Sequence, residues 1–204
     1  MTGDIFSEHP EYLKGKARQS VFSFYNRVKR IGPLSPKCMF DLFKSLTQPI
    51  LLYGSDIWGF SNRNVASVDL LLNWFLRMIL CVKNGTCIPM LYGESGVFPP
   101  SVHCHQNVIL YYIRLNNLPS GSVLKSVFNE MQNLRDLSTC NNWCSNVSKL
   151  AKIYEIDIES LEFSDKTKLQ VKSIIRQKFI SDWLHKINDS VNNPGLRLYK
   201  MFKF

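Results

Sequence analysis

The sequence has no long uninterrupted run of apolar residues, and residues 1–10 lack the apolar core of a secretion signal. A membrane-spanning helix needs roughly 18 or more such residues, so neither a membrane span nor secretion is expected. We therefore expect an intracellular protein, in the cytoplasm or the nucleus, with no membrane partner.

The pattern of β-strands is also missing. No segment alternates strictly between apolar and polar residues, and no hairpin dipeptide joins two β-branched segments. Apolar residues instead recur at spacings of three and four between short breakers. This pattern predicts an all-α fold, with a helical bundle over residues 1–84, a connector over 85–101 and a second helical region over 102–204.

Motifs for catalysis are absent as well. The chain has no P-loop, no dinucleotide-binding glycine pattern, no His-Glu-x-x-His, no Asp-Asp pair, and only four histidines. Gly93-Glu-Ser-Gly96 is close to a hydrolase nucleophile elbow, but Val97 occupies the place of the final glycine. We expect no enzymatic activity, no catalytic residue and no cofactor.

The six cysteines are expected to be reduced thiols inside the cell. His103, Cys104 and His105 would make a zinc site with Cys140 and Cys144 if the two segments met. Cys-x3-Cys is an uncommon spacing, however, and neighbouring residues point to different sides of a helix. No metal is expected, and the sequence leaves open whether Cys104, Cys140 and Cys144 meet.

Positive charge is in excess, with a formal net charge of +9. Residues 1–50 hold eight Lys and Arg against four Asp and Glu, residues 51–163 hold eight against nine, and residues 164–204 hold nine against three. The positive charge therefore lies at the two ends of the chain, which favours a polyanionic partner.

The first helix is expected from about Tyr12 to Ile31. Apolar residues recur every three or four positions and form a core stripe: Leu13, Ala17, Val21, Phe24, Val28 and Ile31. Basic residues on its other faces are candidate nucleic-acid ligands: Lys14, Lys16, Arg18, Arg27, Lys29 and Arg30. Gly32-Pro33 should end this helix, and Ser35-Pro36 should begin the next.

The apolar stretch Ser45–Gly59 is expected at the centre of the first bundle. Pro49 has no N–H, so it should end or kink a helix arriving through residues 39–46, with Leu46 facing inward, before residues 50–58 continue. A long central helix should follow over about 65–82. From these segments the core is expected to include Pro49, Leu52, Tyr53, Trp58, Trp74 and Phe75.

Arg77 is a cation within the apolar helix expected over about 65–82. It should reach the edge of the core or pair with a carboxylate such as Asp56 or Asp69, and direct contact with nucleic acid is the alternative.

Further helices are expected near residues 102–115, 122–137, 139–154 and 165–187. The last of them carries Lys168, Lys172 and Arg176 at four-residue steps. Such a row is most often a solvated face, but an equally basic first helix makes it a second part of the candidate nucleic-acid surface.

Several short motifs follow one another in a definite order: Lys14-Gly-Lys-Ala-Arg18, Gly32-Pro33, Pro49 to Trp58, Phe75-Leu-Arg77 to Leu80, Leu91-Tyr-Gly-Glu-Ser-Gly96 with Pro99, and Leu196-Arg-Leu-Tyr-Lys200. This order resembles the region after the catalytic palm in reverse transcriptases of LINE-type (non-LTR) retrotransposons. The resemblance implies a thumb-like helical bundle followed by the start of a post-thumb helical region, truncated at its C-terminus.

In such enzymes the thumb grips the template and the primer, and palm carboxylates bind the two catalytic metal ions. Those carboxylates usually include an aromatic-x-Asp-Asp turn, and this sequence has no Asp-Asp pair. The resemblance therefore implies sequence-independent binding of RNA or an RNA–DNA hybrid without polymerase activity. The alternative is a helical protein-interaction module whose cationic faces only keep it soluble.

Overall fold

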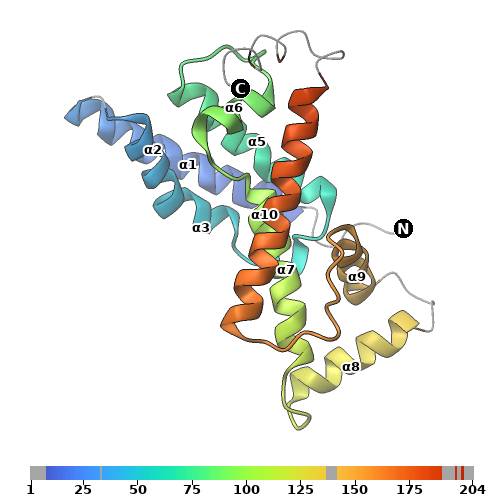
Figure 1. The fold of residues 1–204 in the computed structure, drawn as a ribbon. Helices are drawn as coiled ribbons and strands as arrows, with labels where there is room; N and C mark the ends of the chain where they lie inside the picture. The colour runs from blue at the N-terminus through green and yellow to red at the C-terminus, as the bar shows by residue number, and fades with distance from the viewer. Residues whose placement is uncertain (1–7, 33, 137–141, 190–195, 197–198, 200–204) are drawn as a thin grey trace. The chain divides into compact units, whose positions relative to one another are not determined.

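The computed structural model describes residues 8–32, 34–136, 142–189, 196 and 199. These residues form helices and connecting segments without a β-strand (Figure 1), so the all-α expectation is confirmed. No helix in this described part is long and apolar enough to cross a membrane.

The chain divides into two compact units. The first contains the described residues up to Tyr53, Asn62–Ser101 and those from Ile180 onward, and the second contains Gly54–Ser61 and Val102–Phe179. The sequence did not predict that residues 54–61 belong to the second unit, or that α10 (Asp165–Asn188) takes part in both.

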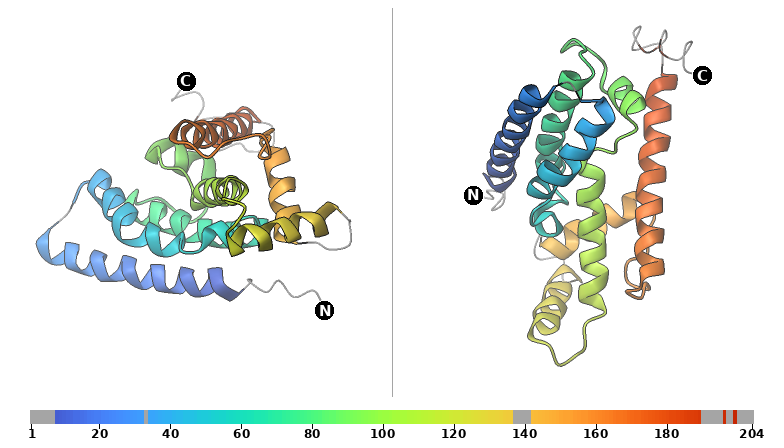
Figure 2. Two further views of the ribbon diagram at one scale, coloured as in Figure 1. Left: turned by 90° about the horizontal axis from the view of Figure 1, so that it is seen from below. Right: turned by 90° about the vertical axis from the view of Figure 1, so that its left-hand side faces the viewer.

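The first unit contains α1 (Glu8–Ile31), α2 (Pro36–Leu42), the π-helical turn η1 (Phe43–Thr47), α3 (Gln48–Leu51), α5 (Asn62–Ile79) and α6 (Ile88–Ser95). α1 packs along α5, η1 and α3 through its expected apolar stripe (Figure 2), except that Ile31 at its end is 80% exposed. Ser35 caps α2 as predicted, because its Oγ accepts a hydrogen bond from the N–H of Cys38 at 3.3 Å.

Phe75 of α5 lies at the centre of this unit. Its side chain is fully buried. Its ring contacts those of Phe24, Phe40 and Phe43 at centroid distances of 6.0, 6.4 and 4.6 Å. These partners come from α1, α2 and η1, so one side chain joins four helical segments.

The helix break expected at Pro49 is present in an unexpected form. Because Pro49 has no N–H to donate to the preceding turn, the helix widens into η1 before α3 begins. The wider turn places Thr47 in the core, where its hydroxyl lies 3.2 Å from that of Ser20. Leu46 is 47% exposed, so its expected inward position is wrong.

The helix expected to run on to Trp58 is interrupted. α3 ends at Leu51, and Gly54 adopts a left-handed φ of 65° before α4 (Ser55–Trp58) begins in the second unit. Tyr53 lies at this turn and is 70% exposed, so its assignment to the core is wrong.

Of the other residues expected in the core, some are buried and others are not. Trp58 and Phe75 are buried as expected. Leu52 and Trp74 are half-buried, and Pro49 is exposed because it lies on the outer side of the first turn of α3.

The connector expected over residues 85–101 contains a helix, α6 (Ile88–Ser95). Pro89 lies in its first turn, where the missing N–H costs nothing, and Gly96 ends it with a left-handed φ of 62°. The indole of Trp183 in α10 donates a hydrogen bond to the carbonyl of Pro89 at 2.8 Å. This bond holds the end of α10 against α6 within the first unit.

The second unit contains α4, α7 (Pro100–Asn116, from Val102 onward), α8 (Val123–Asp136), α9 (Trp143–Ile153) and the first part of α10. Tyr112 of α7 is fully buried, stacks on Trp143 at 5.9 Å and meets Phe128 edge-on at 5.1 Å. α9 begins after Asn142, whose Oδ1 accepts from the N–H of Ser145 at 2.9 Å, and residues 139–141 of the expected helix lie outside the described residues.

Replacing Phe75 by Ala should lower the free energy of unfolding by about 3–5 kcal/mol, because it removes the shared ring and leaves a cavity. Denaturant titration monitored by circular dichroism measures this loss. Tyr53→Ala is the matched control, since this aromatic side chain is exposed, and it should cost less than about 1 kcal/mol. Equal losses for the two variants would contradict the assignment of Phe75 as the centre of the core.

Gly93→Ala should destabilise the protein by about 1–3 kcal/mol. A Cβ at this position would meet the hydroxyl of Tyr199 and lie 2.9 Å from the ring of Trp183. Gly15→Ala is the control, because no atom lies within 4 Å of a Cβ there and alanine favours helix, so this change should stabilise α1. If thermal unfolding shows that both substitutions change the melting temperature in the same direction relative to the parent, this packing is contradicted.

Candidate nucleic-acid interface

The basic residues of α1 lie on two flanks of its buried stripe. Helical spacing places Lys14, Arg18 and Lys29 on one side of the Leu13-to-Phe24 stripe, and Lys16, Arg27 and Arg30 on the other. The structure therefore separates six candidates that the sequence had treated as one set.

The flank with Lys14 and Arg18 faces α5. The amine of Lys14 lies 2.6 Å from a carboxylate oxygen of Glu11 and donates to the hydroxyl of Ser67 at 3.2 Å. The guanidinium of Arg18 lies over the ring of Trp74 at 5.4 Å. These two cations already have partners within the bundle, so they are less available to a ligand.

The flank with Lys16, Arg27 and Arg30 is exposed along the helix. Arg27 and Arg30 make no hydrogen bond or ion pair with the described residues, and Lys16 lies only over the ring of Tyr12, at 5.6 Å. Arginine stays protonated at any physiological pH and presents donors in a fork that fits phosphate oxygens. We call these three side chains the cationic flank of α1.

The row on α10 lies in the second unit and has its own contacts. The amine of Lys168 lies 2.8 Å from the carboxylate of Asp165 and 4.6 Å from the ring centre of Phe163. Lys172 is half-buried, and its carbonyl accepts a hydrogen bond from the amide of Gln106. Arg176 is exposed and already interacts with another group of the protein.

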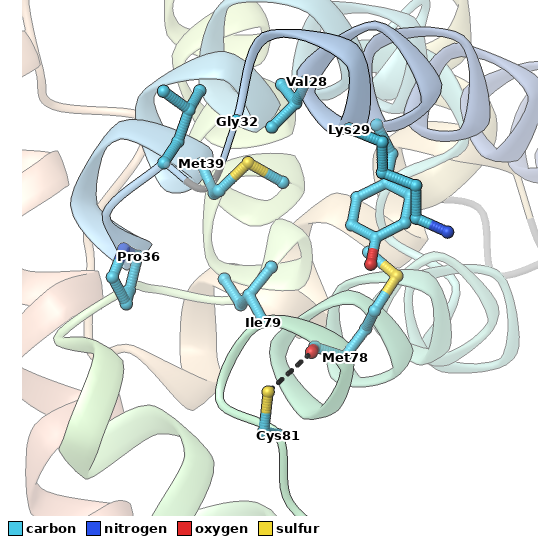
Figure 3. A pocket seen from close by; sticks show the side chains of 10 residues that line it. Val28, Lys29, Gly32, Pro36, Met39, Met78, Ile79 and Cys81 are labelled. Atoms are coloured by element: carbon cyan, nitrogen blue, oxygen red, sulfur yellow. Dashed lines mark hydrogen bonds between the residues drawn. The ribbon is translucent and has the colours of Figure 1, made fainter.

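Lys29 lines a hollow of about 400 Å³ at one end of the first unit (Figure 3). The walls come from α1, α2 and α5 and are mostly apolar, with Val28, Met39 and Met78 among them. The Lys29 amine lies 4.9 Å from the ring centre of Tyr25. Lys29 thus borders an apolar hollow and is not part of the cationic flank of α1.

A buried polar row on α5 was missed at the level of sequence. The carboxylate of Asp69 accepts a hydrogen bond from the N–H of Ser101 at 2.8 Å, and Asn73 accepts one from the hydroxyl of Tyr92 at 2.7 Å. Asp69, Asn73 and Arg77 recur at four-residue steps in residues 68–79 of α5, which are otherwise apolar, and this spacing was the available signal. Burial raises the pKa of Asp69 to about 6 and also raises the pKa of Tyr92.

Arg77 ends this row. Its guanidinium donates to the carbonyl of Thr86 at 3.2 Å, which ties the end of α5 to the segment that follows it. The described residues show no ion pair between Arg77 and Asp69, and the Nε of Arg77 is buried without a hydrogen bond. The cation is bound by a backbone carbonyl, so of the two arrangements expected from the sequence, the edge of the core or an ion pair, the pairing with Asp69 is not found among the described residues.

The thiols of Cys104 and Cys144 are buried in the second unit, while Cys140 lies outside the described residues. Burial raises the pKa of Cys144 to about 11 and lowers that of His105 to about 4. His105 Nδ1 lies 2.6 Å from the hydroxyl of Tyr154. Within the described ranges no group of three or more His, Cys, Asp or Glu side chains is arranged to hold a metal ion.

Comparisons of the chain with models of protein families, with curated proteins and with solved structures find no match.

The raised pKa of Asp69 predicts a specific pH dependence. An unfolded aspartate has a pKa near 4, so the folded protein holds this proton more tightly, and the associated stability is present below about pH 4 and lost as pH rises through about 6. Asp69→Asn keeps an acceptor for Ser101 and does not titrate. Urea titrations between pH 4 and 7 should therefore show the stability of the parent, relative to the variant, falling as pH rises.

His105 also titrates, but its contribution is common to both proteins and cancels in this difference. If the stability of the parent relative to Asp69→Asn is constant over this pH range, or rises with pH, the raised pKa of a buried Asp69 is contradicted.

Proposed function

We propose that the chain is a non-catalytic part of a non-LTR retrotransposon reverse transcriptase that binds RNA or an RNA–DNA hybrid without sequence preference. The family assignment rests on the order of the short motifs alone. The binding proposal rests on one observation, that the cationic flank of α1 exposes Lys16, Arg27 and Arg30 with few contacts inside the protein.

Lys and Arg side chains that neutralise phosphates release condensed counterions, which supplies affinity without reading bases. Arg27 and Arg30 lie three residues apart on a helix anchored by Phe24 and Phe75. A rigid helix holds charges at fixed spacing, so less side-chain and backbone freedom is lost on binding. The flank suits a nucleic-acid backbone better than a small anion, because its charges are spread along the helix axis.

A second candidate function has its own observation. α8 carries an exposed apolar stripe, with Val123, Val127 and Leu134 82%, 52% and 41% exposed, while Phe128 on another face is buried. Helical spacing puts these three residues within a narrow sector. Such a stripe supports the alternative of a protein-interaction module, in which the cations of α1 serve solubility.

Replacing Lys16, Arg27 and Arg30 together by Glu should weaken binding to an RNA–DNA hybrid by at least about 100-fold at roughly 0.1 M salt, because three attractive phosphate contacts become repulsive. Fluorescence anisotropy with a labelled hybrid measures the affinity. Folding should be unchanged by circular dichroism, since these positions avoid the buried stripe.

The control replaces Lys37, Lys44 and Lys83 by Glu, which alters the net charge equally at exposed positions elsewhere in the first unit. It should weaken binding by less than about tenfold. If the folded α1 variant binds like the parent, or if both variants lose affinity equally, the cationic flank is not the binding site and the interaction module becomes the better account.

A further inference from the structure

The second unit has a hollow lined by charged, polar and aromatic side chains. Its volume is about 300 Å³, and it is lined by Asp56, Asn107, Tyr111, Arg114, Phe163 and Lys168. These residues come from α4, α7, the segment before α10 and α10 itself. A neighbouring hollow of about 410 Å³ shares Arg114 and Phe163 with it, so the two extend past the same cation and the same ring.

Two cations line this hollow. Arg114 is exposed and makes no ion pair or hydrogen bond with the described residues. Lys168 is paired with Asp165, but the side chain of that aspartate is 94% exposed, so the pair is weak. An anionic ligand can therefore replace Asp165 as the partner of Lys168. A guanidinium beside an ammonium is a common arrangement for binding phosphate.

Two aromatic rings lie in the same walls. Phe163 is 37% exposed, and the ring of Tyr111 is fixed by an edge-on contact with Trp143 at 5.9 Å. Exposed aromatic rings give nucleobases a surface to stack on, and such stacking tolerates any base.

The remaining polar groups accept hydrogen bonds. Asn107 uses its amide N–H to donate to the hydroxyl of Ser55 at 2.9 Å, and its side-chain carbonyl oxygen is an acceptor. Asp56 contributes a carboxylate, an acceptor that repels phosphate but binds hydroxyl donors. Cations, rings and acceptors in one hollow correspond to the phosphate, base and ribose of a ribonucleotide.

We propose that this hollow binds one unpaired ribonucleotide unit, with its phosphate at Arg114 and Lys168, its base against the exposed ring of Phe163, and its ribose hydroxyls at Asp56. The unit belongs either to a free nucleotide or to single-stranded RNA. The site lies in the other unit from the cationic flank of α1, so it does not depend on the function proposed for that flank.

Isothermal titration of the full chain with AMP, adenosine and inorganic phosphate tests the site. AMP should bind at least about tenfold more tightly than either of its parts, because only AMP engages the cations and the rings together. Arg114→Ala should weaken AMP binding by at least about tenfold and leave adenosine binding unchanged, and Phe163→Ala should weaken AMP without affecting phosphate.

Lys152→Ala is the matched control, because this cation of α9 is exposed in the same unit and does not line the hollow. It should leave AMP binding unchanged, as should the triple Glu variant of α1. In the triple Glu variant of α1, which lacks the cationic flank, a short oligoadenylate that binds more tightly than AMP identifies single-stranded RNA as the source, whereas equal or weaker binding identifies the free nucleotide. The proposal is overturned if phosphate binds as tightly as AMP, or if Arg114→Ala and Lys152→Ala have the same effect.

Discussion

The ring of Phe75 is the contact on which the first unit depends. It stacks on Phe43 at 4.6 Å and meets Phe24 and Phe40 edge-on, and it is completely shielded from solvent. Each partner belongs to a different helical segment. Since buried aromatic pairs have preferred geometries, this cluster fixes the orientation of α1 more strongly than a diffuse apolar interface would.

The orientation of α1 decides which of its cations are free. The same helix that buries Phe24 turns Lys14 and Arg18 towards α5, where Ser67 contacts Lys14 and Trp74 contacts Arg18, and Glu11 of α1 itself pairs with Lys14. The opposite flank remains in solvent. Helical geometry thus links packing to function. The apolar stripe fixes the rotation of α1 about its own axis, and this rotation determines which basic residues a polyanion can reach.

Features fixed by local chemistry were predictable from sequence. The stripe of α1, the cap of α2 by Ser35 and the burial of Trp58 follow from spacing, capping preference and side-chain size. The helix α6 could also have been predicted, because Pro89 in a first turn and Gly96 after a last turn are signals of helix boundaries.

Local departures from regular helix geometry, and contacts between residues distant in sequence, were not predictable. The exposure of Tyr53 depends on the left-handed Gly54, and that of Leu46 depends on the π-helical turn before Pro49. The partners of Arg18 and the hollow around Arg114 join residues that spacing does not bring together. The sequence therefore identified the basic residues, while their division into engaged and free ones needed the fold.

The most direct test of the central claim is the salt dependence of hybrid binding by the parent protein. If the three side chains of the cationic flank each neutralise a phosphate, log affinity should fall against log salt with a slope of about −2 to −3, at about 0.7–0.9 per contact. This slope should be the same for hybrids of unrelated sequence. A slope near zero, or an affinity that follows base sequence at constant salt, would contradict electrostatic binding by α1.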